Sequence, residues 1–440
     1  MKNKVADIYD SSVHGIDKKH IPELRFPEFA NTGEWEMGRL GESYHVQGGY
    51  AFKSSDFQKD GIPIVRISNI PIDALCIELE GCVFAHCTQR MEQYTIQEGD
   101  LLIAMSGATT GKTAVYHYPQ KAYLNQRVGL FVSCAQEKQH YAFLGQWAKS
   151  DNFYAQLDKI LAAGAQPNIS SSDIESMIWQ YPKQKEEQQK IAECLSSIDE
   201  QILATQQKWD SLKEHKRGLM QKLFPANGKT TPDFRFPEFA NAGEWEEKKL
   251  GKVFDRIVEK NIENNKNVLT ISAQYGLINQ LDFFNKSVSA TDVTGYYLLH
   301  KGDFAYNKSR SQGKPVGAIK PLKLYEVGVV STLYICFRCK EQHQIDFWEQ
   351  YFDAGALDKS IMAIAQEGAR NHGLLNISTN DFFDLSIMVP SPAEQKKIAD
   401  CLSALDEMIA AQAQKAEALK EHKRGLMQRL FPNNNIDFKN

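Results

Sequence analysis

Residues 186–225 read EEQQKIAECLSSIDEQILATQQKWDSLKEHKRGLMQKLFP, and residues 393–432 read AEQKKIADCLSALDEMIAAQAQKAEALKEHKRGLMQRLFP. About two thirds of the paired positions are identical without a gap, and LKEHKRGLMQ recurs letter for letter. Self-similarity on this scale indicates a chain built from two copies of one structural unit. The fold therefore depends on what the repeated segment forms.

Each copy has the apolar spacing of one long helix. Apolar residues recur at alternating steps of four and three, which matches a coiled-coil seam. At 1.5 Å per residue, about 35 helical residues span on the order of 50 Å. The pattern predicts two helices that bury their stripes against each other. The predicted packing positions are Ile191, Leu195, Ile198, Ile202, Leu212, Leu219, Ile398, Leu402, Leu405, Ile409, Leu419 and Leu426.

The helix ends and two internal glycines carry further information. Ser391, Pro392 and Glu394 offer an N-cap, a first-turn proline and a capping-box glutamate. Gly218 and Gly425 lie inside the pattern, where glycine costs about 1 kcal/mol relative to alanine. A close helix crossing or a docked partner would explain them. The adjacent His-Lys-Arg triplets could meet phosphate or a partner's acidic surface, although a solvated helix face is the simpler interpretation.

A second block also recurs. LRFPEFANTGEWEMGRLG at 24–41 returns as FRFPEFANAGEWEEKKLG at 234–251. Between the repeated blocks, roughly 42–183 and 252–391, the halves resemble each other only in outline, as short strands with some helix. We interpret the repeated blocks as serving one shared function and the diverged segments between them as serving two different functions. A mosaic of recombination events could produce the same contrast. The expected fold class is α+β.

Composition bounds the function. The 440 residues are 42% hydrophobic and 24% charged, an ordinary globular composition. The net charge of −4 means that any nucleic-acid surface must be local or supplied partly by a partner. No apolar run approaches the roughly 20 residues of a membrane span, and the N-terminus lacks the hydrophobic core of a signal peptide. We expect a cytoplasmic protein without membrane contact.

The eight cysteines are scattered and favour reduced thiols. The single C-x-x-C, Cys336 to Cys339, lies in an expected strand, and no second pair follows at zinc-site spacing. We therefore expect no metal site.

The stretch LLIAMSGATTGKTAVY at 101–116 resembles a nucleotide-binding P-loop, which would make the chain an ATPase or GTPase. The first glycine of that motif is replaced by Ser106, and the residues after Lys112 favour a strand over a helix. The corresponding loop of the second half has Pro315 after Lys314, which offers neither a hydroxyl for Mg²⁺ nor an N–H for phosphate. Both differences argue against a nucleotide site.

Both loops instead have a local surplus of basic residues. No acid lies between 106 and 127, and the second loop has Lys301, Lys308, Arg310, Lys314, Lys320 and Lys323 against Asp303 alone. Basic side chains in such loops could bind DNA phosphates or guanine edges. For any single residue, an ordinary solvent-exposed hairpin turn is an equally good interpretation. The candidate DNA contacts are Tyr50, Arg66, Asn69, Lys112, Lys121, Gln126, Arg127, Lys308, Arg310, Gln312 and Lys314.

Three repeated signatures carry a resemblance to a known family. They are the twin FPEF…GEW…LG segments, the twin Asn-Ile-Ser elements at 168–170 and 376–378, and the EQ-x-x-I-A starts of both long helices. The spacing of the preceding proline differs, since four residues separate Pro182 from its Glu-Gln pair and one residue separates Pro392 from its own. Together the segments resemble the specificity subunit of type I restriction-modification systems over nearly the full length.

The resemblance implies two mixed α/β target-recognition domains, each reading one half of a bipartite, asymmetric site on double-stranded DNA. It implies that two long antiparallel helices with pseudo-two-fold symmetry set the spacing and dock two modification (methyltransferase) subunits. S-adenosylmethionine would then belong to those partners, and ATP and Mg²⁺ to further restriction subunits. The chain shows no methylation motif and no P-loop, so we expect no catalysis and no cofactor of its own.

The expected organisation has six parts. They are an N-terminal tail (1–23), a first recognition domain (24–183), a central helix (184–226), a second recognition domain (227–391), a distal helix (392–432) and a C-terminal tail (433–440). A modification-only complex is the nearest alternative. A P-loop protein and a coiled-coil scaffold are more remote, because a scaffold gives no reason for the globular segments to diverge.

Overall fold

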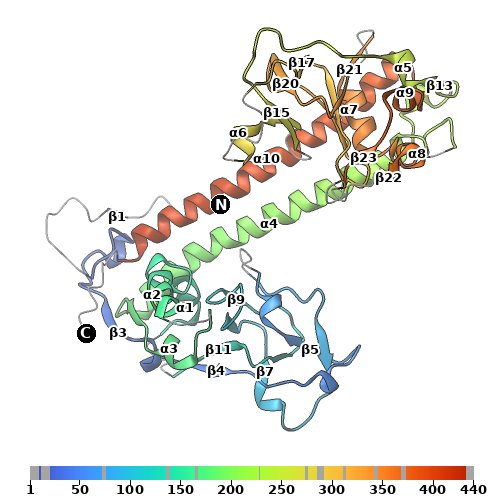
Figure 1. Ribbon diagram of the computed structural model, residues 1–440. Helices are drawn as coiled ribbons and strands as arrows, with labels where there is room; N and C mark the ends of the chain where they lie inside the picture. The colour runs from blue at the N-terminus through green and yellow to red at the C-terminus, as the bar shows by residue number, and fades with distance from the viewer. Residues whose placement is uncertain are drawn as a thin grey trace. The chain divides into compact units, whose positions relative to one another are not determined.

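The repeated segments form the two long helices that the sequence predicts. In the computed structural model, α4 (Lys185–Leu223) and α10 (Pro392–Leu430) have 39 residues each (Figure 1). The structure describes residues 9–10, 20–71, 76–134, 139–163, 167–226, 228–272, 276–284, 292–310, 314–340, 345–367 and 373–432.

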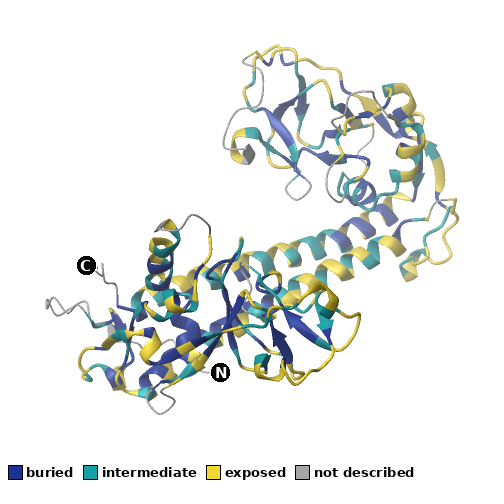
Figure 2. Cartoon of the chain, turned by 60° about the horizontal axis from the view of Figure 1, so that its bottom comes forward, coloured by how far each residue is buried: buried dark blue, intermediate teal, exposed yellow. Residues whose placement is uncertain are grey.

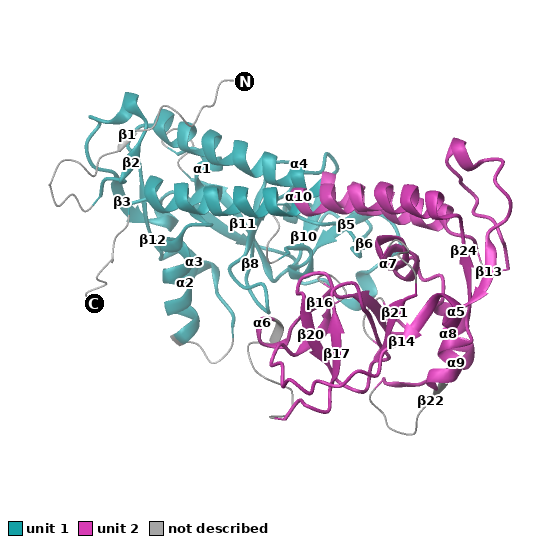
Figure 3. Ribbon diagram, turned by 90° about the horizontal axis from the view of Figure 1, so that it is seen from above, with its two compact units in different colours: residues 1–207, 413–440 teal, residues 208–412 magenta. Residues whose placement is uncertain are grey.

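The chain divides into two units, and each long helix contributes to both (Figure 3). The first unit comprises Met1–Gln207 with Ala413–Asn440, and the second comprises Lys208–Gln412. Each unit therefore contains one globular part, the near end of one long helix and the far end of the other.

The globular part of the first unit is built on two four-stranded sheets. One has the order β4-β11-β8-β9 and is antiparallel, and the other has the order β6-β5-β10-β7 with one parallel pair, β5 with β10. The strands are β3 (Glu36–Arg39), β4 (Tyr44–Gly48), β5 (Ile62–Val65), β6 (Val83–Ala85), β7 (Thr95–Ile96), β8 (Leu101–Ala104), β9 (Thr113–Val115), β10 (Ala122–Leu124), β11 (Val128–Ser133) and β12 (Ile178–Tyr181), with β1 (Tyr9–Asp10) and β2 (Leu24–Arg25) paired. The helices are α1 (Tyr141–Trp147), α2 (Asp151–Ala163) and α3 (Ser171–Glu175).

The globular part of the second unit has one four-stranded antiparallel sheet, in the order β14-β21-β18-β19, and several two-stranded ones. The strands are β13 (Glu246–Lys249), β14 (Phe254–Arg256), β15 (Leu269–Ser272), β16 (Gly276–Asn279), β17 (Tyr297–His300), β18 (Phe304–Asn307), β19 (Ala318–Pro321), β20 (Val327–Val330), β21 (Ile335–Cys339), β22 (Gln366–Glu367), β23 (Leu375–Asn376) and β24 (Ser386–Val389). The helices are α5 (Leu250–Val253), α6 (Gln280–Phe284), α7 (Ile345–Asp353), α8 (Asp358–Ile364) and α9 (Thr379–Phe383). The predicted mixture of helix and strand is confirmed in both halves.

Each unit buries the start of one long helix with the end of the other. In the first unit, the opening turns of α4 share a core with Trp35, Phe143 and the last turns of α10. In the second, the end of α4 and the opening turns of α10 share a core with Trp245 and Phe347. Within a unit, the two helical segments therefore run in opposite directions.

The predicted packing positions differ in burial (Figure 2). The buried ones are Ile191, Leu195, Ile198, Ile202, Ile398, Leu402 and Leu426. The half-buried ones are Leu212, Leu219, Leu405, Ile409 and Leu419. The buried positions lie where the helices also pack against aromatic residues of the globular parts. The other positions stay half-buried, because one helix alone covers only part of another helix's surface.

The two repeated blocks are joined by the same buried ion pair in each unit. Arg25 donates from Nε and Nη2 to both carboxylate oxygens of Glu187, at 2.7 and 2.8 Å. Arg235 makes the same contacts with Glu394, at 2.8 and 2.7 Å. The FPEF block thus holds the start of the following long helix. The predicted capping box is wrong, because the Glu394 carboxylate is bound by Arg235, although Ser391 Oγ does accept from the Glu394 N–H at 3.3 Å.

A buried Gln-Asp-Lys triad ties three segments of the first unit together. Lys423 of α10 donates to both carboxylate oxygens of Asp199 on α4, at 2.6 Å each. Gln146 of α1 donates to the same carboxylate at 3.0 Å. Burial lowers the pKa of Lys423 to about 8, because desolvation of the ammonium outweighs the attraction of Asp199.

The second unit repeats this triad with equivalent residues. Lys216 of α4 donates to both carboxylate oxygens of Asp406 on α10, at 2.6 and 2.7 Å, and Gln350 of α7 donates to Asp406 at 2.7 Å. The lysine of each His-Lys-Arg triplet is thus turned toward the other helix. The close-crossing explanation for Gly218 and Gly425 is wrong, since a Cβ built on either would meet no atom within 4 Å.

We expect the two triads to differ in strength. The side chains of Lys423 and Asp199 are 8% and 11% exposed, whereas those of Lys216 and Asp406 are 14% and 47% exposed. Lys423→Met leaves a buried carboxylate without its cation and should cost about 3–5 kcal/mol. Lys216→Met leaves a carboxylate that water still reaches and should cost about 1 kcal/mol. Denaturant midpoints of both variants measure the difference, and equal losses would contradict it.

Candidate nucleic-acid interface

The loop between β8 and β9 is a tight turn between two strands. Gly107 and Gly111 have φ values of +81° and +80°, and the Gly111 N–H donates to Ala104 O at 2.8 Å. A Cβ at Gly111 would lie 2.0 Å from Leu157 Cδ2. The glycines therefore serve a hairpin that packs against α2. A strand follows the loop, where a P-loop requires a helix, so the prediction against a P-loop is confirmed.

Three other segments meet this loop through backbone and side-chain hydrogen bonds. Met105 N–H donates to Arg127 O at 2.9 Å, and Ile169 N–H donates to Met105 O at 2.9 Å. Thr109 Oγ1 donates to Ile67 O at 3.2 Å, and Thr110 Oγ1 donates to Pro167 O at 2.7 Å. We call residues 105–112 and these partners the first loop cluster.

Several of the predicted DNA contacts join or border this cluster. The Gln126 N–H donates to Tyr50 O at 2.9 Å, which places Tyr50 beside the Gln126-Arg127 turn. Gln126 and Arg127 are exposed, and Tyr50 is half-buried against Phe52 and Tyr94. This arrangement presents an amide, a guanidinium and an aromatic ring on one surface, the groups that read base edges and contact phosphates.

Asn69 is a correction to the predicted interface. Its side chain is 2% exposed, and its amide is committed to the backbone. Oδ1 accepts from the Arg66 N–H at 3.0 Å and Nδ2 donates to Glu78 O at 2.8 Å. Arg66 itself is half-buried and donates to Gly81 O at 3.3 Å. These residues hold the turn after β5 in shape.

Two lysines of the first unit have partners within the chain. Lys112 Nζ lies 4.6 Å from the centroid of the Tyr154 ring, a cation–π contact. Lys121 is exposed and lies 3.5 Å from Glu92. The structure therefore places Lys112 against α2 and Lys121 beside the 3₁₀ helix that precedes β7.

The second basic loop is attached to its own Asn-Ile-Ser element. The Leu375 N–H donates to Lys308 O at 3.0 Å, and the Arg310 N–H donates to Gly373 O at 2.9 Å. Lys308 is half-buried, and burial lowers its pKa. Arg310 is exposed, and Gln312 lies outside the described residues. We call Lys308, Arg310 and residues 373–375 the second loop cluster.

The Asn-Ile-Ser elements have a structural role that the motif alone did not reveal. Ile169 and Ile377 are buried, at 4% exposure each. Ser170 Oγ accepts from the Asp173 N–H and Ser378 Oγ accepts from the Asp381 N–H, both at 3.1 Å, so each serine caps the short helix that follows. The Ser-x-x-Asp spacing is typical of a helix N-cap, and it was the feature of the sequence that could have predicted this capping role.

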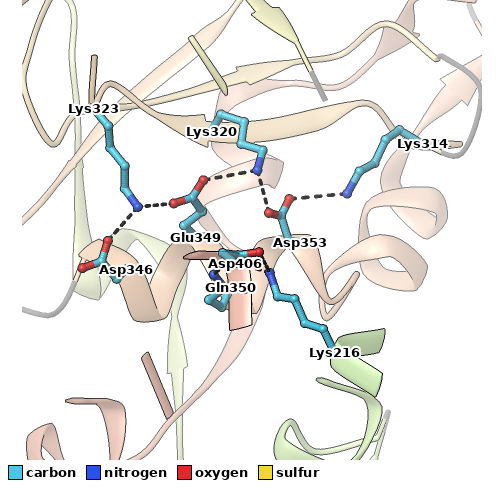
Figure 4. A network of polar contacts seen from close by, with 9 residues as sticks. All are labelled: Lys216, Lys314, Lys320, Lys323, Asp346, Glu349, Gln350, Asp353 and Asp406. Atoms are coloured by element: carbon cyan, nitrogen blue, oxygen red, sulfur yellow. Dashed lines mark hydrogen bonds and ion pairs between the residues drawn. The ribbon is translucent and has the colours of Figure 1, made fainter. Parts of the chain in front are cut away.

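The predicted basic surplus of the second loop is wrong, because α7 supplies opposing acids (Figure 4). Lys320 Nζ lies 2.6 Å from Asp353 and 3.2 Å from Glu349, and Lys323 pairs with Asp346 and Glu349. Although burial opposes it, these carboxylates raise the pKa of Lys320. Between residues 301 and 323 the sequence has Asp303 as its one acidic residue, because Asp346, Glu349 and Asp353 lie further along the chain.

Lys314 is part of the same network. Its Nζ lies 3.5 Å from Asp353, and its side chain is 26% exposed. Lys308 and Arg310 remain the candidate cations of the second loop cluster, where backbone hydrogen bonds hold them beside residues 373–375.

The C-x-x-C of the second half lies in strand β21. Cys336 is buried, and burial raises the pKa of its thiol to about 12, which disfavours the thiolate that a metal requires. In the part of the chain that the structure describes, no cluster of three His, Cys, Asp or Glu side chains is arranged to hold a metal ion. Across the same residues, no helix is both long and apolar enough to cross a membrane.

The two units define a class of protein with a repeated structural frame and two different polar loop clusters. The sequence model described as "Type I restriction modification DNA specificity domain" matches the chain twice, at residues 32–214 and 242–421. The chain therefore belongs to this family and is a type I restriction-modification specificity subunit with two copies of the domain.

Known relatives agree with this assignment. The MjaVIII type I restriction enzyme specificity subunit of Methanocaldococcus jannaschii is 27% identical over 233 residues, which are 50% of this chain and 54% of that protein. The putative MjaX specificity subunit of the same organism is 24% identical over 420 residues, 90% and 93% of the two chains. The chain thus matches about half of the first relative and nearly all of the second.

A solved structure shares the fold. The type I restriction-modification S subunit from M. genitalium superposes with a TM-score of 0.58 at 12% identity, covering 94% of this chain and 100% of that one.

Asn69→Ala should lower stability, whereas Gln126→Ala should not. The first variant leaves the Arg66 N–H and the Glu78 carbonyl without a partner, at a cost of about 1–3 kcal/mol. The second removes an exposed side chain and should change stability by less than about 0.5 kcal/mol. Thermal melting of the two variants tests the assignment. If Asn69→Ala melted with the unmodified chain, Asn69 would return to the list of DNA contacts.

Proposed function

We propose that this chain reads a bipartite, asymmetric site on double-stranded DNA, with one loop cluster for each half-site. The observation that carries the proposal is one structural frame built twice around two different sets of polar side chains. The Arg25–Glu187 and Arg235–Glu394 pairs are equivalent, whereas the loops they support are not.

The chemistry of the loop clusters supports DNA as the ligand. The first offers Gln126 and Arg127 as exposed donors beside Tyr50. The second offers Lys308 and Arg310. Arginine donates two hydrogen bonds to guanine, glutamine pairs with adenine, and lysine contacts phosphates or guanine. Different donors in the two clusters would give two unrelated half-sites.

We further propose that α4 and α10 form an antiparallel coiled-coil spacer with pseudo-two-fold symmetry. The register of the triads supports this: the step from Asp199 to Lys216 along α4 equals the step from Asp406 to Lys423 along α10. At 1.5 Å per residue, 39 residues span roughly 58 Å, the length of about 17 base-pair steps at 3.4 Å. Such a spacer would separate the half-sites by unread bases.

The remaining roles are assigned to partners. Two modification subunits would dock on the spacer helices and use S-adenosylmethionine, and restriction subunits would use ATP and Mg²⁺. The chain itself would act in the cytoplasm as a non-catalytic, cofactor-free subunit. The hairpin around Gly111, which takes the place of a nucleotide loop, supports this division.

Methylome sequencing of the source genome, with and without this gene, tests the proposal. Loss of methylated adenines at one split motif is the expected result. Replacing residues 42–183 with the corresponding segment of another family member should then change one half of the motif and leave the other intact. A change in both halves, or a methylome that does not depend on the gene, would contradict the proposal.

Arg127→Ala should weaken binding of the assembled complex to its specific duplex by about 1–3 kcal/mol, which is roughly 5- to 150-fold. Arg127 is exposed in the first loop cluster, and its removal takes one contact from the DNA. Arg90→Ala, an exposed arginine of the same unit outside the cluster, is the matched control. Fluorescence anisotropy at several salt concentrations measures both, and equal effects of the two variants would remove Arg127 from the interface.

A further inference from the structure

A cavity of about 590 Å³ lies in the first unit, where the corner between α1 and α2 faces the last turns of α10. Residues 149–154 form one wall, and residues 417–431 of α10 form another. Four basic side chains line it, Lys149, Lys420, Lys423 and Arg424, against three acidic ones, Asp151, Asp199 and Glu417.

The three acidic side chains are already engaged. Glu417 pairs with Lys420 at 2.8 Å, and Asp199 is held by Lys423 and Gln146. Asp151 accepts from Gln428 Nε2 at 3.2 Å.

Two cations remain without an acidic partner. In the described part of the chain, neither Lys149 nor Arg424 has a carboxylate within ion-pair distance. The cavity therefore presents two cations without an acidic partner, from α10 and from the α1–α2 corner. Because the Gln428 amide does not neutralise Asp151, the four basic and three acidic lining side chains leave a net charge of +1.

The internal repeat provides a comparison for the arginine. Arg424 and Arg217 occupy the same place in LKEHKRGLMQ. In the second unit, the exposed Arg217 pairs with Glu214 at 2.7 Å. Glu421 occupies the place of Glu214 in the first unit, but Arg424 makes no ion pair with it and instead lines the cavity.

The repeat also provides a comparison for the lysine. Gln146 and Gln350 make equivalent bonds to the triad aspartates, so Lys149, three residues after the first, corresponds to Asp353. Asp353 pairs with Lys320 and reverses the charge at that place. The second unit therefore lacks the lysine, and its equivalent arginine, Arg217, is paired with Glu214.

The neighbouring side chains add to the positive field. Tyr154 lines the cavity, and the Lys112 ammonium lies over its ring at 4.6 Å. Burial lowers the pKa of Lys423, and Lys149 contributes to that lowering. A bound anion would relieve the repulsion among these cations.

We propose that this cavity binds a phosphate group, held by Arg424 and Lys149. A guanidinium offers a planar fork of donors that matches two phosphate oxygens, and an ammonium supplies the second charge that a phosphate dianion requires. The phosphate is either part of a DNA backbone or a free phosphate ester. The proposal stands on the first unit alone and does not depend on the DNA-reading role of the loop clusters.

Titration calorimetry of the full-length chain with inorganic phosphate tests the site, at constant ionic strength and near neutral pH. One saturable site is expected. Arg424→Gln and Lys149→Gln should each weaken phosphate binding by about 10- to 150-fold, since a charge-assisted hydrogen bond contributes roughly 1.5–3 kcal/mol. Arg217→Gln removes the equivalent arginine of the same decamer and should leave phosphate binding unchanged.

A second arm distinguishes the sources. If a short DNA duplex competes with phosphate in the unmodified chain but not in Arg424→Gln, the site takes a backbone phosphate. If phosphate binds and the duplex does not compete, the site takes a free phosphate ester. Absence of saturable binding, or equal losses in Arg424→Gln and Arg217→Gln, would overturn the proposal. Thermal melting checks that the variants fold, and neither outcome bears on the methylome experiment.

Discussion

The bidentate ion pair between an arginine of the FPEF block and a glutamate at the start of a long helix is the contact on which each unit depends. Arg25 and Glu187 are almost fully buried, as is Glu394, whereas the Arg235 side chain is 12% exposed. Each pair joins segments about 160 residues apart, across an entire globular part. Removing two charges from water is costly, so such a pair is retained only when both partners stay in place. This constraint explains why both blocks changed little while the sequence between them diverged.

The frame leaves the loops free to vary. The first loop cluster is fastened mainly through backbone groups, as in the bonds from Met105 to Arg127 and from Ile169 to Met105. Backbone hydrogen bonds do not depend on side-chain identity, so exposed residues such as Gln126 can change without loss of the fold. The backbone groups that support a loop are thus separate from the side chains that the loop exposes. This separation would let the proposed DNA specificity change while the fold is kept.

Electrostatic pairing restricts where DNA could be met. The lysines on β19 and beside it are matched by a row of acids on α7 (Figure 4). Lys216 and Lys423 of the repeated decamer are matched by aspartates on the opposite helix. These lysines are therefore not available to DNA. Arg127 and Arg424 differ from them, because both are exposed.

The sequence by itself determined the two long helices, the mixture of strand and helix in both globular parts and the strand after Lys112 where a P-loop would need a helix. These features follow from periodicity, turn residues and short motifs, which act between residues close together along the chain. Only the tertiary structure decided that Asn69 is buried, that Glu394 binds Arg235 in place of capping its helix, and that α7 neutralises the second basic loop. Charge pairs and burial depend on residues distant in sequence, as with Asp199 and Lys423, 224 positions apart, so no local pattern could reveal them.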